Sequence, residues 1–340
     1  MRAIEWVEDH LRLLDQTKIP HKIEFIEVLK VDQLIDAIVS LAVRGAPALG
    51  ATGAYGVVTA IDQAKKENWD EKELEKQILR IRNARPTAVN LAWGADQAHQ
   101  IIKKGRDEVL KLAHKIAQED EDGNKQMGKY AADWILNKSG KNKLNILTHC
   151  NTGMLATTEW GTAFGVIREL YNRGNVELVY ADETRPLLQG SRLTAWELVQ
   201  NNIPHLVLAD GAASSTILRK KVDVALIGAD RIAANGDTAN KIGSLSVALA
   251  CYEANIPFLV IAPESTIDLN CLSGEEIEIE LRDDSEILNF NGQRVAPLES
   301  RGYNPAFDVT PAKYISAIVT QLGVIEVSKG ETPAKRKSGK

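Results

Sequence analysis

The chain has 340 residues, which suggests about two domains at roughly 150 residues per domain. Its composition, 44% hydrophobic and 26% charged, is that of an ordinary globular protein and excludes a disordered or fibrous chain. The formal net charge of −5 lacks the basic character of a nucleic-acid-binding protein, and no apolar run reaches the roughly 18 residues that a membrane-spanning helix needs.

The cysteines and the N-terminal residues indicate in which cellular compartment the protein works. Cys150, Cys251 and Cys271 occur without any CxxC pair. An odd number of such cysteines argues against a disulfide scaffold or a structural zinc site and is typical of a reducing compartment. Glu5 stands where a signal peptide would carry its apolar run. We therefore expect a cytoplasmic protein.

The first third of the chain is predicted to be mostly helical. Short strand-like segments open it, and helical spacing of apolar residues then predicts helices over 31–42, 71–83, 88–103 and 107–117. Gly50, Gly53 and Gly56 recur every three residues on one helix face, which allows another backbone to approach closely. The acidic stretch 119–123 predicts a break or hinge, so we expect the first domain to cover residues 1–122.

From residue 144 onward, strands and helices alternate. Short apolar, β-branched runs predict strands at 145–148, 177–180, 205–208, 224–227 and 258–261, and helical segments separate them at 158–171, 193–201 and 244–253. This alternation predicts an α/β domain over 123–328, with a parallel sheet covered on both faces. Residues 329–340 are basic and lack an apolar pattern, which predicts a disordered tail.

Ligands of such sheets bind beyond the carboxyl ends of the strands, and two reactive side chains stand there. Cys150 follows the first predicted strand at an expected strand-to-helix junction, where a thiol is shifted toward the thiolate. A buried core cysteine is the alternative for Cys150. Asp230 follows the fourth strand and is expected to be half-buried, with the raised pKa of a general acid or base. An ion pair with Arg231 is the alternative for Asp230. For Cys251, inside an apolar helix, we expect only a core role.

For three further residues near the strand ends the sequence suggests a role less directly. Asn240 and Lys241 precede a predicted helix start at Gly243, and a lysine beside helix-terminal amides suggests a phosphate cradle. His149 has no second histidine nearby, so a structural role is expected for it.

Several cofactor classes lack support. The sequence contains neither GxGxxG nor GxxxxGK[ST], so dinucleotide and P-loop nucleotide binding are not predicted. No His, Cys or carboxylate cluster has metal-ligand spacing. An isomerase that uses side-chain acids and bases, with no cofactor and no metal, is compatible with these observations.

Several long segments together resemble signatures of the methylthioribose-1-phosphate isomerase family. They are residues 44–50, 85–91, 148–153, 182–186 with 189–194, 228–231 with 240–243, and 260–263. The match runs from about Arg2 to Ile325 in the family's order and spacing, which is far more specific than any one short pattern.

The resemblance implies a smaller, mostly helical N-terminal domain, a C-terminal Rossmann-like domain and a homodimer. It also implies that Cys150 and Asp230 are the catalytic pair. The substrate contacts that it implies are Arg44, Gly45, Ala46, Arg85, Gln189, Asn240 and Lys241. Every one of these positions holds the residue that the family pattern expects. Partners would be a small sugar phosphate and a second copy of the chain, with neither nucleic acid nor membrane involved.

The implied reaction converts 5-methylthioribose 1-phosphate to 5-methylthioribulose 1-phosphate in methionine salvage. Two alternatives remain open. One is a related substrate, ribose 1,5-bisphosphate or 5-deoxyribose 1-phosphate. The other is a non-catalytic protein like the regulatory subunits of the eukaryotic translation-initiation exchange factor, which resemble the same family. A methylthio group needs an apolar pocket, which Trp93 and Tyr55 are able to line, although such aromatics more often belong to the core.

Overall fold

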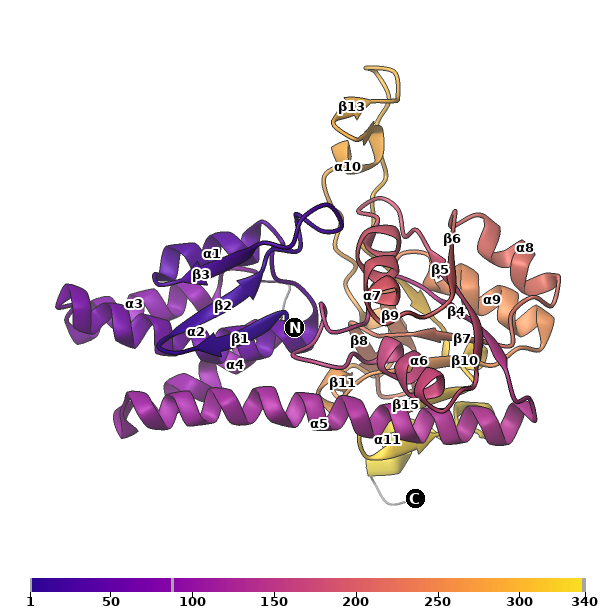
Figure 1. The fold of residues 1–340 in the computed structure, drawn as a ribbon, viewed down its shortest axis with the longest axis horizontal. Coiled ribbons are helices and arrows are strands. Elements are labelled where there is room, and N and C mark those ends of the chain that lie inside the picture. The colour runs from indigo at the N-terminus through magenta and orange to yellow at the C-terminus, as the bar shows by residue number, and fades with distance from the viewer. Residues whose placement is uncertain (1, 87–88, 338–340) are drawn as a thin grey trace. The chain divides into compact units, whose positions relative to one another are not determined.

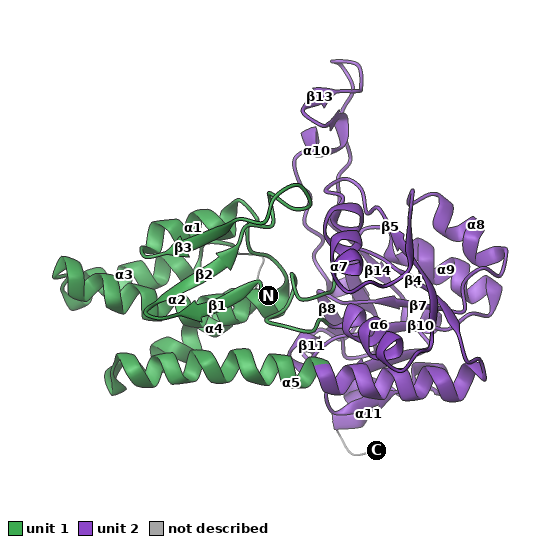
Figure 2. Ribbon diagram, in the orientation of Figure 1, with its two compact units in different colours: residues 1–124, 152–161 green, residues 125–151, 162–340 purple. Residues whose placement is uncertain are grey.

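The computed structural model describes residues 2–86 and 89–337, which form two compact units (Figures 1 and 2). The first unit runs to Asn124 and also takes in residues 152–161, and the second contains 125–151 and everything from Thr162 onward. The boundary therefore lies two residues beyond the predicted one at 122, and the inclusion of 152–161 in the first unit is not evident from the sequence.

The first unit combines a small antiparallel sheet with packed helices. The sheet has the order β1 (Ile4–Val7), β2 (His10–Leu14), β3 (Phe25–Val28). The helices are α1 (Val31–Val39), α2 (Ala46–Glu67), α3 (Glu71–Arg82), α4 (Val89–Gln100) and the first part of α5 (Arg106–Ser139). The helix predicted over 88–103 starts on Ala88, which lies outside the described residues.

Glycines in α2 bring that helix into close contact with α4. A Cβ on Gly53 would collide with the carbonyl oxygen of Leu91, and one on Gly94 would collide with the carbonyl oxygen of Gly50. A Cβ on Gly56 would lie 2.6 Å from the Leu34 side chain. The packing role predicted for this glycine face is confirmed.

Helix α5 corrects the break predicted at 119–123. It continues without interruption through the acidic stretch, and the division between the two units falls within it. The charges there have partners: Asp120 accepts hydrogen bonds from Thr158, and Arg2 Nη2 lies 2.7 Å from Glu121 Oε2. Paired carboxylates repel one another less, so the helix tolerates them.

The second unit is built on a seven-stranded sheet of order β16-β15-β10-β7-β4-β5-β6, parallel except for β16. Its strands are β4 (Leu144–Thr148), β5 (Val176–Asp182), β6 (His205–Leu208), β7 (Val224–Ile227), β10 (Phe258–Ile261), β15 (Ala317–Thr320) and β16 (Gly323–Ile325). Five of these are the predicted strands. The α/β class is thereby confirmed.

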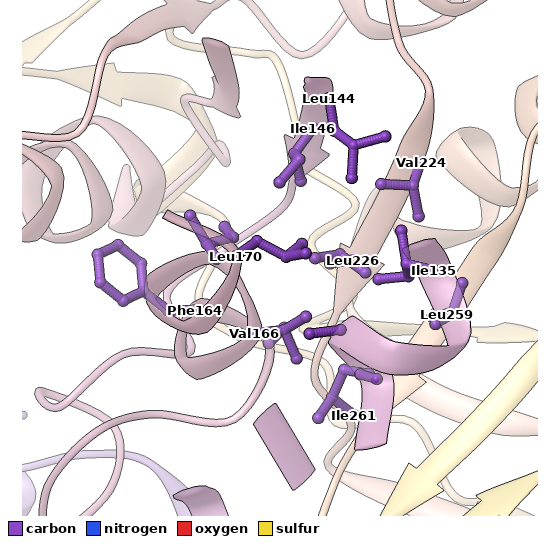
Figure 3. Packing of buried hydrophobic residues seen from close by; sticks show 14 of the residues in the cluster. Ile135, Leu144, Ile146, Phe164, Val166, Leu170, Val224, Leu226, Leu259 and Ile261 are labelled. Carbon is purple, nitrogen blue, oxygen red and sulfur yellow. The ribbon is translucent and has the colours of Figure 1, made fainter. Parts of the chain in front are cut away.

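Apolar side chains cover both faces of the sheet. On one face, Ile135 of α5 and Phe164 of α6 (Ala163–Asn172) pack over β4, β7 and β10 (Figure 3). On the other face lie α8 (Ala212–Leu218) and α9 (Ser244–Ala254), where Cys251 is fully buried. The core role expected for Cys251 is confirmed.

Smaller elements complete the second unit. Helix α7 (Ala195–Gln200) follows a π-helical turn at Gly190–Thr194. A second sheet has the order β11-β8-β9-β14, formed by β8 (Arg231–Ala233), β9 (Thr238–Lys241), β11 (Ile267–Asp268) and β14 (Phe307–Thr310). A projecting arm carries α10 (Ser285–Leu288), β12 (Asn289–Phe290) and β13 (Gln293–Arg294) (Figure 1).

Two segments differ from the sequence expectations. The helix predicted over 158–171 begins only at Ala163, because residues 152–161 are bound to the first unit. In the tail expected to be disordered, α11 (Pro333–Lys337) forms instead: Pro333 is buried, and Arg336 Nη1 donates to the Gly323 carbonyl (3.2 Å). Residues 338–340 lie outside the described residues. No helix among those described is long and apolar enough to cross a bilayer.

Candidate functional site

The strand order of the large sheet points to one place for a ligand. From β4 the chain adds β5 and β6 on one side, and β7, β10 and β15 then follow on the other side. Strands β4 and β7 are therefore neighbours at which the winding reverses, with Thr148 opposite Leu226. Ligands of such sheets bind outside the carboxyl ends of the two strands at this reversal. Cys150 follows β4 and Asp230 follows β7.

Cys150 is held in a constrained backbone conformation. Its φ is +63°, which is unusual for a residue with a side chain, and only 8% of its surface is exposed. Its backbone N–H donates to Thr184 Oγ1 (2.9 Å), and its carbonyl accepts from Thr194 Oγ1 (2.6 Å). Two threonines from the segments after β5 thus fix the cysteine from both sides.

The chain leaves Cys150 differently from what the sequence analysis predicted. No helix begins there, because the chain passes through 152–161 and α6 starts at Ala163. The helix N-terminus that was expected to activate the thiol is therefore absent from this position. Asn151, also buried, turns instead toward Glu197 and donates Nδ2 to its Oε1 (2.8 Å).

Asp230 is exposed, whereas the sequence analysis expected a half-buried carboxylate. Strand β7 ends at Ile227, so Asp230 stands beyond the buried part of the strand. Its backbone N–H donates to the Ala239 carbonyl (2.9 Å), which anchors it to β9. Arg231, the ion-pair partner considered for it, lies 3.5 Å from Asp268.

Behind Cys150 lies a buried network that the sequence analysis did not find. His149 is 1% exposed; its Nδ1 lies 2.9 Å from Asp182 Oδ2, and its Nε2 lies 2.8 Å from the Ile242 carbonyl oxygen. Burial acts against a charged ring, but the hydrogen bonds to Asp182 and to Ile242 prevail and raise the pKa of His149. The structural role expected for His149 matches these contacts.

His149, Asp182 and Asp210 also place possible metal-ligand atoms within 4.8 Å of one another. Both ring nitrogens of His149 already face acceptors, however. The Asp210 carboxylate accepts from the backbone N–H groups of Thr184 (2.8 Å) and Arg185 (2.7 Å). A metal would have to displace these hydrogen bonds, so the donor set fits a hydrogen-bonded network better. Its members lie at or just beyond the ends of three different strands, which is why no spacing in the sequence shows the network.

Gln189 lies just before the π-helical turn that follows β5. Only 6% of its surface is exposed, and its Oε1 has no hydrogen-bond partner among the residues that the structure describes. An unsatisfied buried amide oxygen costs free energy in the ligand-free protein. Such an atom is available to accept a hydrogen bond from a bound ligand.

Asn240 and Lys241, the residues of the predicted phosphate cradle, end β9 and have contacts within the protein. Asn240 Nδ2 donates to Ser244 Oγ (2.7 Å), and Lys241 Nζ lies 4.7 Å from the centre of the Phe307 ring. The backbone N–H groups of Gly243 and Leu245, at the start of α9, both donate to the Asp308 carboxylate. Two of the helix-terminal amides thus already donate to a carboxylate within the protein, and phosphate binding at this helix start stays a prediction.

The remaining predicted contacts belong to the first unit. Gly45 caps α2 with φ +94°, and a Cβ there would collide with the Ala156 carbonyl, so only glycine fits between Arg44 and Ala46. Arg85 follows α3 and is half-buried. The segment after Arg85 includes Thr87 and Ala88, which lie outside the described residues.

Tyr55 and Trp93, the two aromatic residues considered for an apolar pocket, differ in how much of their surface is exposed. Tyr55 is 4% exposed and its hydroxyl lies 2.9 Å from His114 Nδ1, as in a core position. Trp93 is 45% exposed, and its ring would lie 3.5 Å from a Cβ placed on Gly50 of α2.

Comparison with known proteins identifies the family. The model of the initiation factor 2 subunit family matches residues 42–327. A methylthioribose-1-phosphate isomerase from Thermoanaerobacter sp. (strain X514) is 46% identical over 99% of each chain. One from Caldanaerobacter subterraneus subsp. tengcongensis is 47% identical over 96% of each chain.

Two solved structures share the fold along almost the whole chain. The 5-methylthioribose 1-phosphate isomerase from Pyrococcus horikoshii OT3 superimposes with a TM-score of 0.87 and is 39% identical, covering 99% of this chain and 94% of that one. The translation initiation factor eIF-2B, subunit delta, from A. fulgidus also has a TM-score of 0.87 and is 40% identical, covering 97% of each chain. The chain therefore belongs to the initiation factor 2 subunit family, and within it to the group that contains the methylthioribose-1-phosphate isomerases.

Proposed function

We propose that this protein converts 5-methylthioribose 1-phosphate to 5-methylthioribulose 1-phosphate, an aldose–ketose isomerisation in methionine salvage. The observation that carries the proposal is the position of Cys150 and Asp230 at the carboxyl ends of neighbouring strands, where the winding of the sheet reverses. The relatives of matching length bear the name of this enzyme.

Cys150 and Asp230 form the catalytic pair in this proposal. The 1-phosphate keeps the sugar closed as a cyclic acetal, so the ring oxygen must be protonated before the ring opens. Asp230 donates that proton, and its exposed position is suited to meeting a ligand that arrives from solvent.

Hydrogen moves from C2 to C1, which oxidises C2 to the ketone and reduces C1, and Cys150 handles the proton at carbon or at oxygen in this step. The threonine contacts to its backbone hold the thiol in place without occupying it. A hydride shift from C2 to C1 is the competing route, and in that route Cys150 stabilises the reacting oxygens instead. Neither route requires a metal or an organic cofactor.

The substrate contacts in the proposal are Arg44, Gly45, Ala46, Arg85, Gln189, Asn240 and Lys241. Two guanidinium groups and one ammonium group suit a phosphate dianion, the former through paired hydrogen bonds and the latter as a point charge. The Oε1 of Gln189, which has no hydrogen-bond partner among the described residues, suits a sugar hydroxyl that donates to it.

The proposal extends to the molecule's setting. In this proposal the second unit, which is built on the parallel sheet, is a Rossmann-like domain. The protein works in the cytoplasm as a homodimer, and it binds neither nucleic acid nor membrane. The modest negative charge and the helix composition are compatible with this setting.

The experiment compares wild-type turnover of three substrates: 5-methylthioribose 1-phosphate, 5-deoxyribose 1-phosphate and ribose 1,5-bisphosphate. We expect the highest kcat/KM for the methylthio sugar, because the bisphosphate needs a second cluster of basic groups for its 5-phosphate. A higher kcat/KM for another sugar would make that sugar the assigned substrate in place of the methylthio sugar. A folded protein that turns over none of them would favour a non-catalytic role, as suggested by the name of the A. fulgidus structure.

A further inference from the structure

One buried histidine connects the catalytic strand end to a substrate-binding segment. His149 precedes Cys150 in the chain, and its Nε2 contacts the carbonyl of Ile242 at 2.8 Å. Ile242 follows Lys241 directly, so a single side chain joins the end of β4 to the end of β9. The carbonyl can only accept, so Nε2 carries the hydrogen.

The backbone next to Ile242 packs tightly against the His149 ring. Gly243 has φ +107°, and a Cβ there would lie 2.7 Å from His149 Cε1 and 3.0 Å from Nε2. The backbone of the segment therefore rests directly on the imidazole ring. The carboxylate of Asp308 holds the other side of the segment through the amide of Gly243 (2.7 Å). Any movement of the ring moves the backbone that carries Asn240 and Lys241.

Stability alone does not explain the network. Asp182 Oδ2 contacts the ring, but Asp182 Oδ1 is buried and has no hydrogen-bond partner within the described part of the chain. A buried carboxylate with an unsatisfied oxygen costs free energy, and apolar side chains of similar volume would fill the same space at lower cost. A requirement for precise side-chain geometry at the site accounts for the presence of the His149–Asp182 network.

We propose that His149 is a positioning residue that holds Asn240 and Lys241 in place relative to Cys150 through the Ile242 carbonyl, while Asp182 orients its ring. This inference rests on the proposed function, because it assigns the two positioned residues to substrate binding. The hydrogen bond to Ile242 serves the binding segment, and the hydrogen bond to Asp182 serves the orientation of the ring.

Two substitutions separate the two hydrogen bonds. In His149→Gln the side-chain amide nitrogen occupies the place of Nε2 and still donates to Ile242, but it loses Asp182. In His149→Asn the amide nitrogen occupies the place of Nδ1 and still donates to Asp182, but it loses Ile242. Both variants are neutral, so the comparison holds charge constant.

We expect the KM for 5-methylthioribose 1-phosphate to rise about tenfold in His149→Asn and to stay within about threefold of wild type in His149→Gln, as for the loss of one hydrogen bond. The thermal unfolding midpoint serves as the readout of a purely structural role. Equal KM values in the two variants, or a larger rise in His149→Gln, would overturn the proposal. His205→Asn, on β6, keeps its local contact to the Ile203 carbonyl and is the matched control.

A third variant covers the case in which neither substitution folds. Gly243→Ala leaves His149 intact and pushes the segment off the ring, so KM should rise while kcat changes less. An unchanged KM in folded Gly243→Ala would overturn the proposal. Absence of turnover by the wild-type protein would instead overturn the proposed function, and this inference with it.

Discussion

Cys150 is positioned by its backbone. Its positive φ is held by hydrogen bonds from its N–H to Thr184 and to its carbonyl from Thr194. Backbone strain of this kind costs on the order of 1–3 kcal/mol and persists where neighbouring groups enforce it. The sulfur is thereby placed by contacts that a change of side chain leaves intact.

Substitutions at Cys150 and Asp230, the proposed catalytic pair, should therefore separate activity from folding. We predict that Cys150→Ser and Asp230→Asn each lower kcat by at least about a hundredfold, the usual contribution of a placed acid or base. Thermal unfolding should change little. Cys271→Ser, in the part of the second unit that carries the smaller sheet, serves as the control and should keep wild-type kcat. Near-native activity at either position would remove that residue from the mechanism.

Substitution of Gln189 should weaken substrate binding without lowering the stability of the fold. Gln189→Met keeps the volume and removes the amide oxygen that has no partner among the described residues. We predict an unfolding free energy equal to or above that of wild type, because a buried unsatisfied group is lost. KM should rise about tenfold for the loss of one substrate hydrogen bond. Urea unfolding and steady-state kinetics measure both, and an unchanged KM would assign Gln189 to the core.

At this scale the sequence allowed some predictions and not others. Cys251 could be assigned to the core because it lies within an apolar helical run. The exposure of Asp230 could not be predicted, because it depends on where β7 ends relative to its neighbours. The His149–Asp182 contact joins residues 33 positions apart, and only the parallel pairing of β4 with β5 brings their ends together.

Among the elements, α5 departs most from its predicted course, because it continues through the acidic stretch 119–123 where a break was expected. Asp120 accepts hydrogen bonds from the backbone N–H (2.8 Å) and the hydroxyl (2.7 Å) of Thr158. Burial raises the pKa of Asp120 to about 6, although these hydrogen bonds act against the rise. The helix thus holds the 152–161 segment through a buried carboxylate whose pKa is raised to about 6.

Stability should depend on pH through Asp120. Because its pKa is higher in the folded state than the ordinary 3.8, its contribution to stability is fully present below about pH 4 and is lost as the pH rises to about 6. We predict that wild type loses about 2–3 kcal/mol of unfolding free energy over this range relative to Asp120→Asn, which cannot ionise. Urea unfolding at several pH values tests this, and parallel curves for the two proteins would contradict it. Thr158→Val should move the transition to higher pH.

The packing of α2 against α4 should tolerate no side chain at Gly53. Alanine raises helix propensity by about 1 kcal/mol, but its Cβ would meet the Leu91 carbonyl and lie 3.0 Å from Ala95 N. We predict that Gly53→Ala destabilises the protein by about 1–3 kcal/mol, since the collision with backbone outweighs the propensity. Gly211→Ala, where nothing lies within 4 Å of the new Cβ, is the control and should change stability by less than about 1 kcal/mol. Equal effects at both glycines would argue against close helix contact.

Elements with strong local patterns were the predictable ones. The runs 224–227 and 258–261 match β7 and β10 residue for residue, since four consecutive apolar residues between turns have few alternatives. The course of 152–161 was missed, because its conformation is set by Asp120, Gly45 and Ala48 far away in the sequence. Strand β15 was also not predicted, although its four residues are fully buried.

For the whole molecule, the α/β class and the place of the site follow from one feature, the alternation of strands and helices from residue 144 onward. That alternation predicts a parallel sheet, and a parallel sheet places ligands at the carboxyl ends of its strands. The point of reversal between β4 and β7 could not be derived from the alternation, because strand order is set by long-range pairing. The resemblance to the isomerase family supplied the pairing of Cys150 with Asp230, and the strand order is compatible with it.

The most direct measurement is the conversion of 5-methylthioribose 1-phosphate by the purified wild-type protein, followed by NMR as the C1 and C2 signals change from aldose to ketose. The account predicts complete conversion to the equilibrium mixture with 5-methylthioribulose 1-phosphate, and no conversion above background by Cys150→Ser or Asp230→Asn. A folded wild-type protein that leaves the aldose signals unchanged would contradict the central claim.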